Sequence, residues 1–209
     1  VTAQEAEKTE IPEITEVPDT QAVRTDPLGS ADSTEILAER VDSSAIRPGD
    51  KIIIVCPAYD TALSVNSSSP RISPVSVTVK ETSKRQVLTQ IPEGTAVLEV
   101  ESAGSKGIYL KCAQRYLTSS STGNRLYYAE SPENCSIWQF RDGHFLYNPN
   151  ASYTSGSNTY RNYYLEYFSG GKSFAIYGKR ASDSEAPFKM AFYRMGNSDP
   201  EDTLKEDSD

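Results

Sequence analysis

Histidine, tryptophan and methionine are scarce in this chain, which has one His, one Trp and two Met among 209 residues. A catalytic nucleophile–His–acid arrangement would have to use His144, and no G-x-S-x-G turn surrounds that residue. The three cysteines show no CxxC pairing, so they do not supply a zinc site together with a single His. We therefore expect no catalytic residue, no metal and no cofactor.

Long apolar runs are also missing. No stretch reaches the roughly 18 consecutive apolar residues that a membrane-spanning helix needs, so we expect no membrane insertion. The first residues lack a basic region followed by an apolar one, so this sequence shows no signal peptide. Gly170-Gly171-Lys172 lacks the spacing of a phosphate-binding loop and reads as a hairpin turn.

Charge is unevenly distributed along the chain. Residues 1–45 hold eleven acidic and three basic side chains, and residues 196–209 hold six and one. The remaining body is mildly basic at about +5, although the whole chain carries −8. Three prolines and few large apolar residues mark the N-terminal part as a linker, with a short helix possible over residues 33–40. We predict an acidic linker at 1–44, a body at 45–195 and an acidic tail at 196–209.

The body is dominated by a strand pattern that occurs three times. A short apolar strand is followed by a second strand, a polar loop and a closing strand of bulky residues. The three passes cover residues 52–56, 62–65 and 96–100; 108–112, 116–118 and 137–140; and 145–147, 163–167 and 188–193. About twelve short strands in three units predict an all-β fold, either a β-trefoil-like barrel or another closed β-barrel.

Particular strands and core positions follow from this pattern. Lys51-Ile52-Ile53-Ile54-Val55 is apolar on both faces and predicts a central strand, and residues 75–79 alternate like a half-buried one. Two core layers are expected from equivalent positions in the three units: Ile54, Leu110 and Leu146 in one layer, and Leu98, Trp138 and Phe192 in the other.

The sequence leaves two states of the cysteines open, free thiols or a disulfide. Cys56 and Cys112 occupy the same place in the first two units, on the inward face of their strands. Together with Cys135 they are expected to be free buried thiols, and a Cys112–Cys135 disulfide is the alternative.

Residues 45–195 resemble an accessory module of large secreted and surface proteins of gut bacteria. Ile46-Arg47-Pro48-Gly49-Asp50-Lys51-Ile52-Ile53-Ile54-Val55 resembles its "xGDKIIIV" entry strand, Thr61-Ala62-Leu63-Ser64 its "ALS" strand, and Arg161-Asn162-Tyr163-Tyr164-Leu165-Glu166-Tyr167 its "RNWLRY" strand. In that family the module is joined to glycan-hydrolysing, nucleotidase or nuclease domains. The resemblance implies a secreted or cell-surface monomeric module, linked to other domains, that serves adhesion, carbohydrate binding or spacing.

Tyrosines gather between residues 147 and 168, interleaved with Asn and Arg. Aromatic faces stack on the CH surfaces of sugars, and Asn and Arg hydrogen-bond to hydroxyls. Packing of the strand explains Tyr163, Tyr164 and Tyr167 equally well. The candidate ligand-binding residues are therefore the loop residues Tyr153, Asn158, Tyr160, Arg161 and Asn162.

Three functions follow from the sequence. The first is a non-catalytic carbohydrate-binding or adhesive module, and the second is a structural spacer without a ligand. The third is a hydrolase built on Glu166 and His144, although Glu166 reads first as an outward-facing residue of a strand. Single-stranded nucleic acid is not expected as a partner, because the body's positive charge is weak and scattered.

Overall fold

The computed structural model of the chain describes residues 35–68, 70–155, 158–160 and 163–196. The chain divides into two units, Val1–Ser33, which lies outside the described residues, and Thr34–Asp209. The described part of the second unit is all-β and holds no α-helix, which confirms the predicted class.

The strands, in chain order, are β1 (Ala38–Val41), β2 (Lys51–Cys56), β3 (Thr61–Ser68), β4 (Arg71–Ser76), β5 (Lys80–Glu81), β6 (Gln86–Leu88), β7 (Leu98–Ser102), β8 (Ile108–Cys112), β9 (Arg115–Ser119), β10 (Leu126–Ala129), β11 (Gln139–Arg141), β12 (Phe145–Asn148), β13 (Tyr153–Ser155), β14 (Asn158–Tyr160), β15 (Tyr163–Phe168), β16 (Ser173–Gly178) and β17 (Ala191–Met195). Five short 3₁₀ turns join them: η1 (Ser43–Ala45), η2 (Pro57–Tyr59), η3 (Gly104–Lys106), η4 (Asn134–Ser136) and η5 (Ser169–Gly171).

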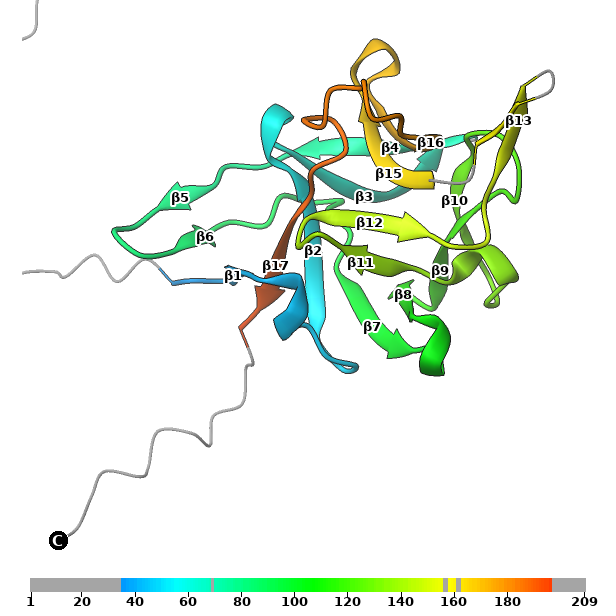
Figure 1. The fold of residues 1–209 in the computed structure, drawn as a ribbon. Helices are drawn as coiled ribbons and strands as arrows, with labels where there is room; N and C mark the ends of the chain where they lie inside the picture. Colours follow the sequence, from blue (N-terminus) through cyan, green and yellow to red (C-terminus); the bar gives the residue numbers. More distant parts are fainter. Residues whose placement is uncertain (1–34, 69, 156–157, 161–162, 197–209) are drawn as a thin grey trace, which may run out of the picture. The chain divides into compact units, whose positions relative to one another are not determined.

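Fifteen of these strands form one antiparallel sheet, and β13 and β14 form a separate hairpin (Figure 1). The main path of the sheet runs β10-β9-β8-β7-β2-β3-β4-β16-β15-β12-β11. Its named strands do not close into a ring, so the predicted trefoil or closed barrel is not confirmed. One isolated pair links β8 to the residue before β11: Ile108 and Trp138 exchange two backbone hydrogen bonds of 2.9 Å.

The central strand is β2, as its sequence predicts. It pairs with β3, β7 and β17. Successive side chains of a strand point to opposite faces, so an apolar run without polar interruption needs cover on both sides. Ile52 and Ile54 lie in the main core, and Ile53 and Val55 lie in a second cluster.

The main core holds the apolar residues of all three repeated units. The residues predicted for the two core layers are all buried in it: Ile54, Leu98, Leu110, Trp138, Leu146 and Phe192. Trp138 satisfies its one polar group inside the core, because its indole Nε1 donates to the carbonyl of Leu117 at 2.8 Å.

A hairpin arm made of β5 and β6 projects from the rest of the fold (Figure 1), and its Leu88 belongs to the second cluster, on the other face of β2. Val77 and Leu88 pack there against Ile53 and Val55. The prediction of a strand over residues 75–79 was wrong in its bounds, because β4 ends at Ser76. Val77 and Val79 alternate because both pack on the second cluster, without belonging to a strand.

The N-terminal boundary also differs from the prediction. A linker to residue 44 and a helix over 33–40 were expected, but β1 pairs with β17 on one side and β6 on the other. Ala38 is fully buried between Met195 and Leu88, its two cross-strand partners. Pairing with two distant strands therefore decides the conformation here, which local sequence cannot reveal.

The cysteines are free and buried, so the proposed Cys112–Cys135 disulfide was wrong. Burial raises the pKa of all three thiols, and that of Cys56 to about 11. Cys135 points its thiol at the carbonyl of Asn150, at 3.4 Å. These residues act as small apolar side chains of the core, as expected.

A candidate ligand-binding face

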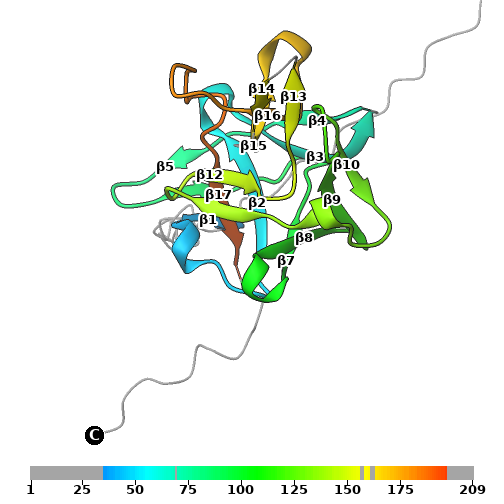
Figure 2. The same cartoon turned by 45° about the vertical axis from the view of Figure 1, so that its right-hand side comes forward.

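Strand β15 separates the core from a second, outward surface. Its side chains alternate strictly: Tyr163, Leu165 and Tyr167 are buried, and the residues between them are half-buried. The half-buried set is Tyr164, Glu166 and Phe168. The connection from β16 to β17 runs beside this strand (Figures 1 and 2).

Aromatic rings from three adjacent strands, β12, β15 and β16, lie on the same side of the sheet as Glu166. Tyr164 lies 5.3 Å, centroid to centroid, from the rings of both Phe145 and Tyr147 on β12. Phe168 lies 5.8 Å from Tyr177 on β16. We call this surface the outer aromatic face, made of Phe145, Tyr147, Tyr164, Glu166, Phe168 and Tyr177.

Cationic side chains lie against the rings of this face. The guanidinium of Arg141 stands 3.4 Å from the centroid of Tyr147, and that of Arg71 stands 4.8 Å from the centroid of Phe168. The ammonium of Lys179 is 5.7 Å from the ring of Phe145. Such contacts hold the rings in fixed positions and leave the face with aromatic and positive character.

Arg71 also belongs to a group of hydrogen bonds around the hydroxyl of Tyr177. Arg71 Nη2 donates to the hydroxyl oxygen of Tyr177 at 3.0 Å, and Asn124 Nδ2 donates to the same oxygen at 2.7 Å. A Cβ added at Gly171 would come within 2.7 Å of Arg71 Nη1, so the guanidinium is closely enclosed. Arg71 therefore organises the face and is not free to reach a distant ligand.

Glu166 lies in a row of three residues across the sheet. Glu166 is the cross-strand partner of Ala175 on β16. On the other side of β16, Phe174 is the partner of Ile72 on β4. Because these two strands are antiparallel, the next position brings Arg71 opposite Ala175. Ala175 is the small residue of the row, so the two charged side chains flank a position with little side-chain volume. The Glu166 carboxyl makes no hydrogen bond or ion pair with another described residue.

The pKa of Glu166 is raised from 4.5 to about 7. Burial is the largest cause, since it disfavours the charged form, and the carboxylate of Asp183 adds to it. The positive charge of Arg71 acts in the opposite direction. Near neutral pH, this carboxyl is therefore present in both its acid and its ionised form.

The residues predicted to bind a ligand lie on the connection between β12 and β15. Tyr153 and Tyr160 are cross-strand partners in the β13–β14 hairpin, and Asn158 pairs with Ser155. The side chains of these three, and Arg161 and Asn162 altogether, lie outside the described residues. The hairpin begins and ends at the edge of the outer aromatic face, since β12 and β15 pair through Tyr147 and Tyr164.

His144 lies in the turn between β11 and β12, where its ring packs on Phe145 at 4.1 Å between centroids. Its backbone N–H donates to Arg141 and its carbonyl accepts from Met190. Its Nε2 is buried and has no hydrogen-bond partner among the described residues. No contact between described residues joins His144 to Glu166, the pair expected in a hydrolase.

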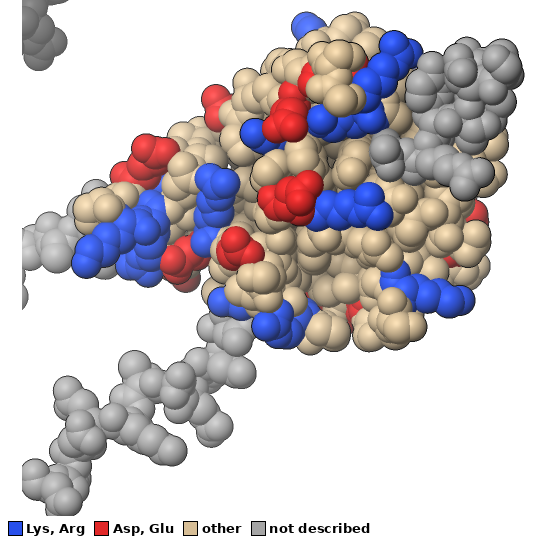
Figure 3. All heavy atoms as spheres, viewed as in Figure 1, with Lys and Arg blue, Asp and Glu red and all other residues tan. Residues whose placement is uncertain are grey.

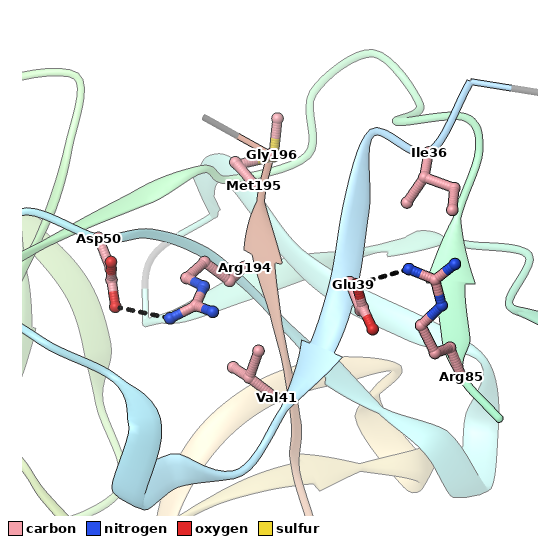
Figure 4. A pocket seen from close by; sticks show the side chains of 8 residues that line it. All are labelled: Ile36, Glu39, Val41, Asp50, Arg85, Arg194, Met195 and Gly196. Carbon is pink, nitrogen blue, oxygen red and sulfur yellow. Dashed lines mark hydrogen bonds and ion pairs between the residues drawn. The ribbon is translucent and has the colours of Figure 1, made fainter. Parts of the chain in front are cut away.

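A separate groove of about 620 Å³ lies across β1 and β17 (Figure 4). Its charged side chains pair with one another: Arg85 with Glu39 at 3.4 Å, and Arg194 with Asp50 at 3.7 Å. Ile36, Val41 and Met195 supply its apolar part. No aromatic ring is among the residues that line this groove.

Charges of both signs are interspersed on the surface that Figure 3 shows, without a continuous basic stripe. Within the described ranges, no three His, Cys, Asp or Glu residues gather as metal ligands. None of the helices that the structure describes is long and apolar enough to cross a bilayer.

Sequence reasoning found the aromatic segment and Glu166 but missed the cross-strand members of the face. Phe145 and Tyr177 could have been found from the alternation of their strands. The place of Arg71 depends on the pairing of β4 with β16, for which the local sequence carries no signal.

Comparison with known proteins adds no family: no protein-family model matches the chain, and no curated protein matches it.

Proposed function

We propose that the chain is a non-catalytic carbohydrate-binding or adhesive accessory module of a secreted or cell-surface bacterial protein. The observation that carries the proposal is the outer aromatic face: the half-buried rings of Tyr164 and Phe168 stand on either side of Glu166 along β15, and its carboxyl has no hydrogen bond or ion pair among the described residues. A surface whose rings only filled a core would be covered, and would not place an unpaired acid at its centre.

The chemistry of the face suits a sugar. The rings of Tyr164 and Phe168 present apolar surfaces to the CH groups of a pyranose, and a carboxylate accepts hydrogen bonds from hydroxyls. Glu166 stands between the two rings on the same strand, so one sugar could contact ring and carboxyl together. The β13–β14 hairpin, with Tyr153 and Tyr160, supplies a second contact region at the edge of the face.

A glycan array probed with the labelled chain tests this proposal. We expect Tyr164→Ala and Phe168→Ala each to weaken binding about tenfold, which corresponds to about 1.4 kcal/mol. Tyr153→Ala and Tyr160→Ala report whether the hairpin contributes. Tyr109→Ala is the matched control, because this half-buried tyrosine lies on β8, outside the face. Silence of the wild-type chain across the array, or equal loss in the control, would contradict the proposal.

The second candidate is a structural spacer without a ligand. It is favoured by the mutual contacts of the face, since Arg71, Phe168, Tyr177 and Asn124 contact one another. If the chain is a spacer, Tyr164→Ala and Phe168→Ala lower its stability and the wild-type chain binds no glycan on the array.

A hydrolase is the third candidate function. It would be supported by hydrolysis of model glycosides that the substitution Glu166→Gln abolishes.

The finer points of architecture and origin are proposals too. A trefoil-like barrel is supported by the Ile108–Trp138 pair and by the shared core of the three repeated units. The resemblance to modules of gut bacteria, carried by the entry strand at Lys51 and the late strand at Tyr163, supports a monomeric module within a longer protein.

A further inference from the structure

We infer that Arg141, on β11, is an anion-binding residue of the outer aromatic face, and that the face takes sugars with a carboxylate in preference to neutral ones. The carboxylate of such a sugar binds the Arg141 guanidinium, and its pyranose ring lies against Tyr164. The inference rests on the proposed function, because it names the class of sugar that the same site takes.

Three cationic side chains lie against the rings of the face, and two of them are already engaged with polar partners. Arg71 donates to the hydroxyl oxygen of Tyr177 at 3.0 Å. Lys179 forms an ion pair of 3.4 Å with Glu185. The side chain of Arg141 makes no hydrogen bond and no ion pair with another residue that the structure describes. Its guanidinium donors are therefore unused within the described part of the chain.

An aromatic ring holds the Arg141 guanidinium in place instead. Its centre lies 3.4 Å from the centroid of Tyr147, so the planar group stacks on the ring. Five N–H donors in one plane form a fork that matches the two oxygens of a carboxylate. Because stacking already fixes this plane, little further ordering of the side chain is needed when an anion binds.

Arg141 is also partly shielded from water. All three residues of β11 are half-buried. Screening by water is weaker at such a position than at an exposed one, so an ion pair formed there contributes more to affinity. The site is therefore better suited to an anion than a fully exposed arginine would be.

The register of the strands places Arg141 within reach of a sugar on the face. Arg141 is the cross-strand partner of Phe145, and Tyr147 lies two residues further along the same strand. Tyr147 is in turn the partner of Tyr164 on β15. Neighbouring strands are about 4.8 Å apart, so the backbones of β11 and β15 are separated by about 10 Å. An arginine side chain and one pyranose ring together span this separation.

Glu166 sets the orientation of the ligand. It lies on the same face of β15 as Tyr164, two residues further along the strand. A carboxylate accepts hydrogen bonds from sugar hydroxyls, but it repels a ligand carboxylate of like charge. The acidic group of the sugar is therefore directed to the β11 side, and its hydroxyls to Glu166. A neutral sugar makes only the contacts with Tyr164 and Glu166, so it binds more weakly.

Calorimetric titration of the full chain with matched sugars tests this inference. The pairs are trigalacturonate with its methyl ester, and sialyllactose with lactose, since the second member of each pair lacks the carboxylate. We expect the acidic member of at least one pair to bind about tenfold more tightly, with a smaller preference at high salt. A preference confined to one pair distinguishes a uronic acid from a sialic acid as the ligand.

Variants assign the preference to one side chain. Arg141→Gln should bind the acidic and neutral members equally, and Arg141→Lys, which keeps the charge without the fork, should retain part of the preference. Arg125→Gln is the matched control, because it removes the same charge from an exposed arginine that lies 5.5 Å from the ring of Tyr127, outside the face. The control should keep the full preference.

A measurement on the wild-type chain needs no variant to fold. The side-chain Nε–H resonance of Arg141 should shift on addition of the preferred acidic sugar and stay in place with its neutral counterpart. Equal affinity for both members of each pair would overturn the inference and leave the proposed function standing. A preference that persists in Arg141→Gln would overturn the assignment to Arg141. Absence of binding to all four sugars would contradict the proposed function together with the inference.

Discussion

Glu166 is the residue whose chemistry depends most on its place in the fold. In sequence it is one polar residue between Leu165 and Tyr167. In the structure burial, together with the carboxylate of Asp183, raises its pKa to about 7. The same burial that makes it a candidate contact also makes its ionisation unfavourable to the folded state.

This shift predicts how stability depends on pH. Between pH 4.5 and pH 7 the folded chain keeps the Glu166 proton, whereas the unfolded chain has lost it. The unfolded state then binds fewer protons, so the Glu166 contribution to the free energy of unfolding falls as pH rises through this range, and is constant above it. Urea unfolding of wild type and Glu166→Gln at several pH values isolates this contribution. A stability difference between the two chains that does not change from pH 4.5 to pH 8 would contradict it.

The backbone conformation of Gly107 leads to a prediction about the stability of the fold. Its φ is +141°, and a Cβ there would come within 2.3 Å of the Trp138 carbonyl oxygen. We expect Gly107→Ala to lower the free energy of unfolding by about 3 kcal/mol, because the close pairing of β8 with Trp138 must open. Gly104→Ala is the matched control. Its φ is +66° with nothing within 4 Å, and it should cost about 1 kcal/mol. Equal losses measured by urea unfolding would show that the close approach is not decisive.

The burial of the three thiols leads to a prediction about how fast they react with a thiol reagent. Cys56, Cys112 and Cys135 are buried, and burial raises the pKa of each. A thiol reagent should label none of them quickly at pH 8 in the native chain, and all three in denaturant. Rapid labelling of Cys56 in the native chain would contradict the burial of its thiol against the carbonyls of Ala186 and Pro187.

At the scale of elements, the sequence predicts strands well where apolar residues alternate or run together. The central β2 and the strand β8 match their predicted positions, because their apolar pattern reflects burial. The strand β1 was missed, because its residues Ala38–Val41 are held by pairing with β6 and β17. The closing strand of the third unit starts three residues later than predicted, at Ala191, although Phe188 is buried as expected.

The β5–β6 arm predicts a distinct contribution to stability. Leu88 is fully buried against Ile53 and Val55 in the second cluster. We expect Leu88→Ala to cost about 2–4 kcal/mol in urea unfolding, because the cavity lies between the arm and the central strand. Lys84→Ala, at the exposed tip of the same arm, should change stability by less than about 0.5 kcal/mol. A negligible effect of Leu88→Ala would mean that the arm is not part of the cooperative fold.

At the scale of the molecule, one half of the candidate site was predictable and the other half was not. Aromatic density between residues 147 and 168 marks β12 and β15, which are close in sequence. Arg71 reaches the same surface from β4, and only the order of strands in the sheet brings it there. The acidic ends of the chain dominate its net charge, so the net charge of the whole chain describes neither the body nor the outer aromatic face.

Two-dimensional NMR of the ¹⁵N-labelled chain, titrated with a pool of neutral oligosaccharides, shows directly where a sugar binds. We predict shifts at Tyr164, Glu166 and Phe168 on β15 and at Tyr177 on β16, with β7 and β8 unchanged. Shifts confined to the groove at Glu39, Arg85 and Arg194, or no shifts at millimolar sugar, would contradict a ligand site on the outer aromatic face.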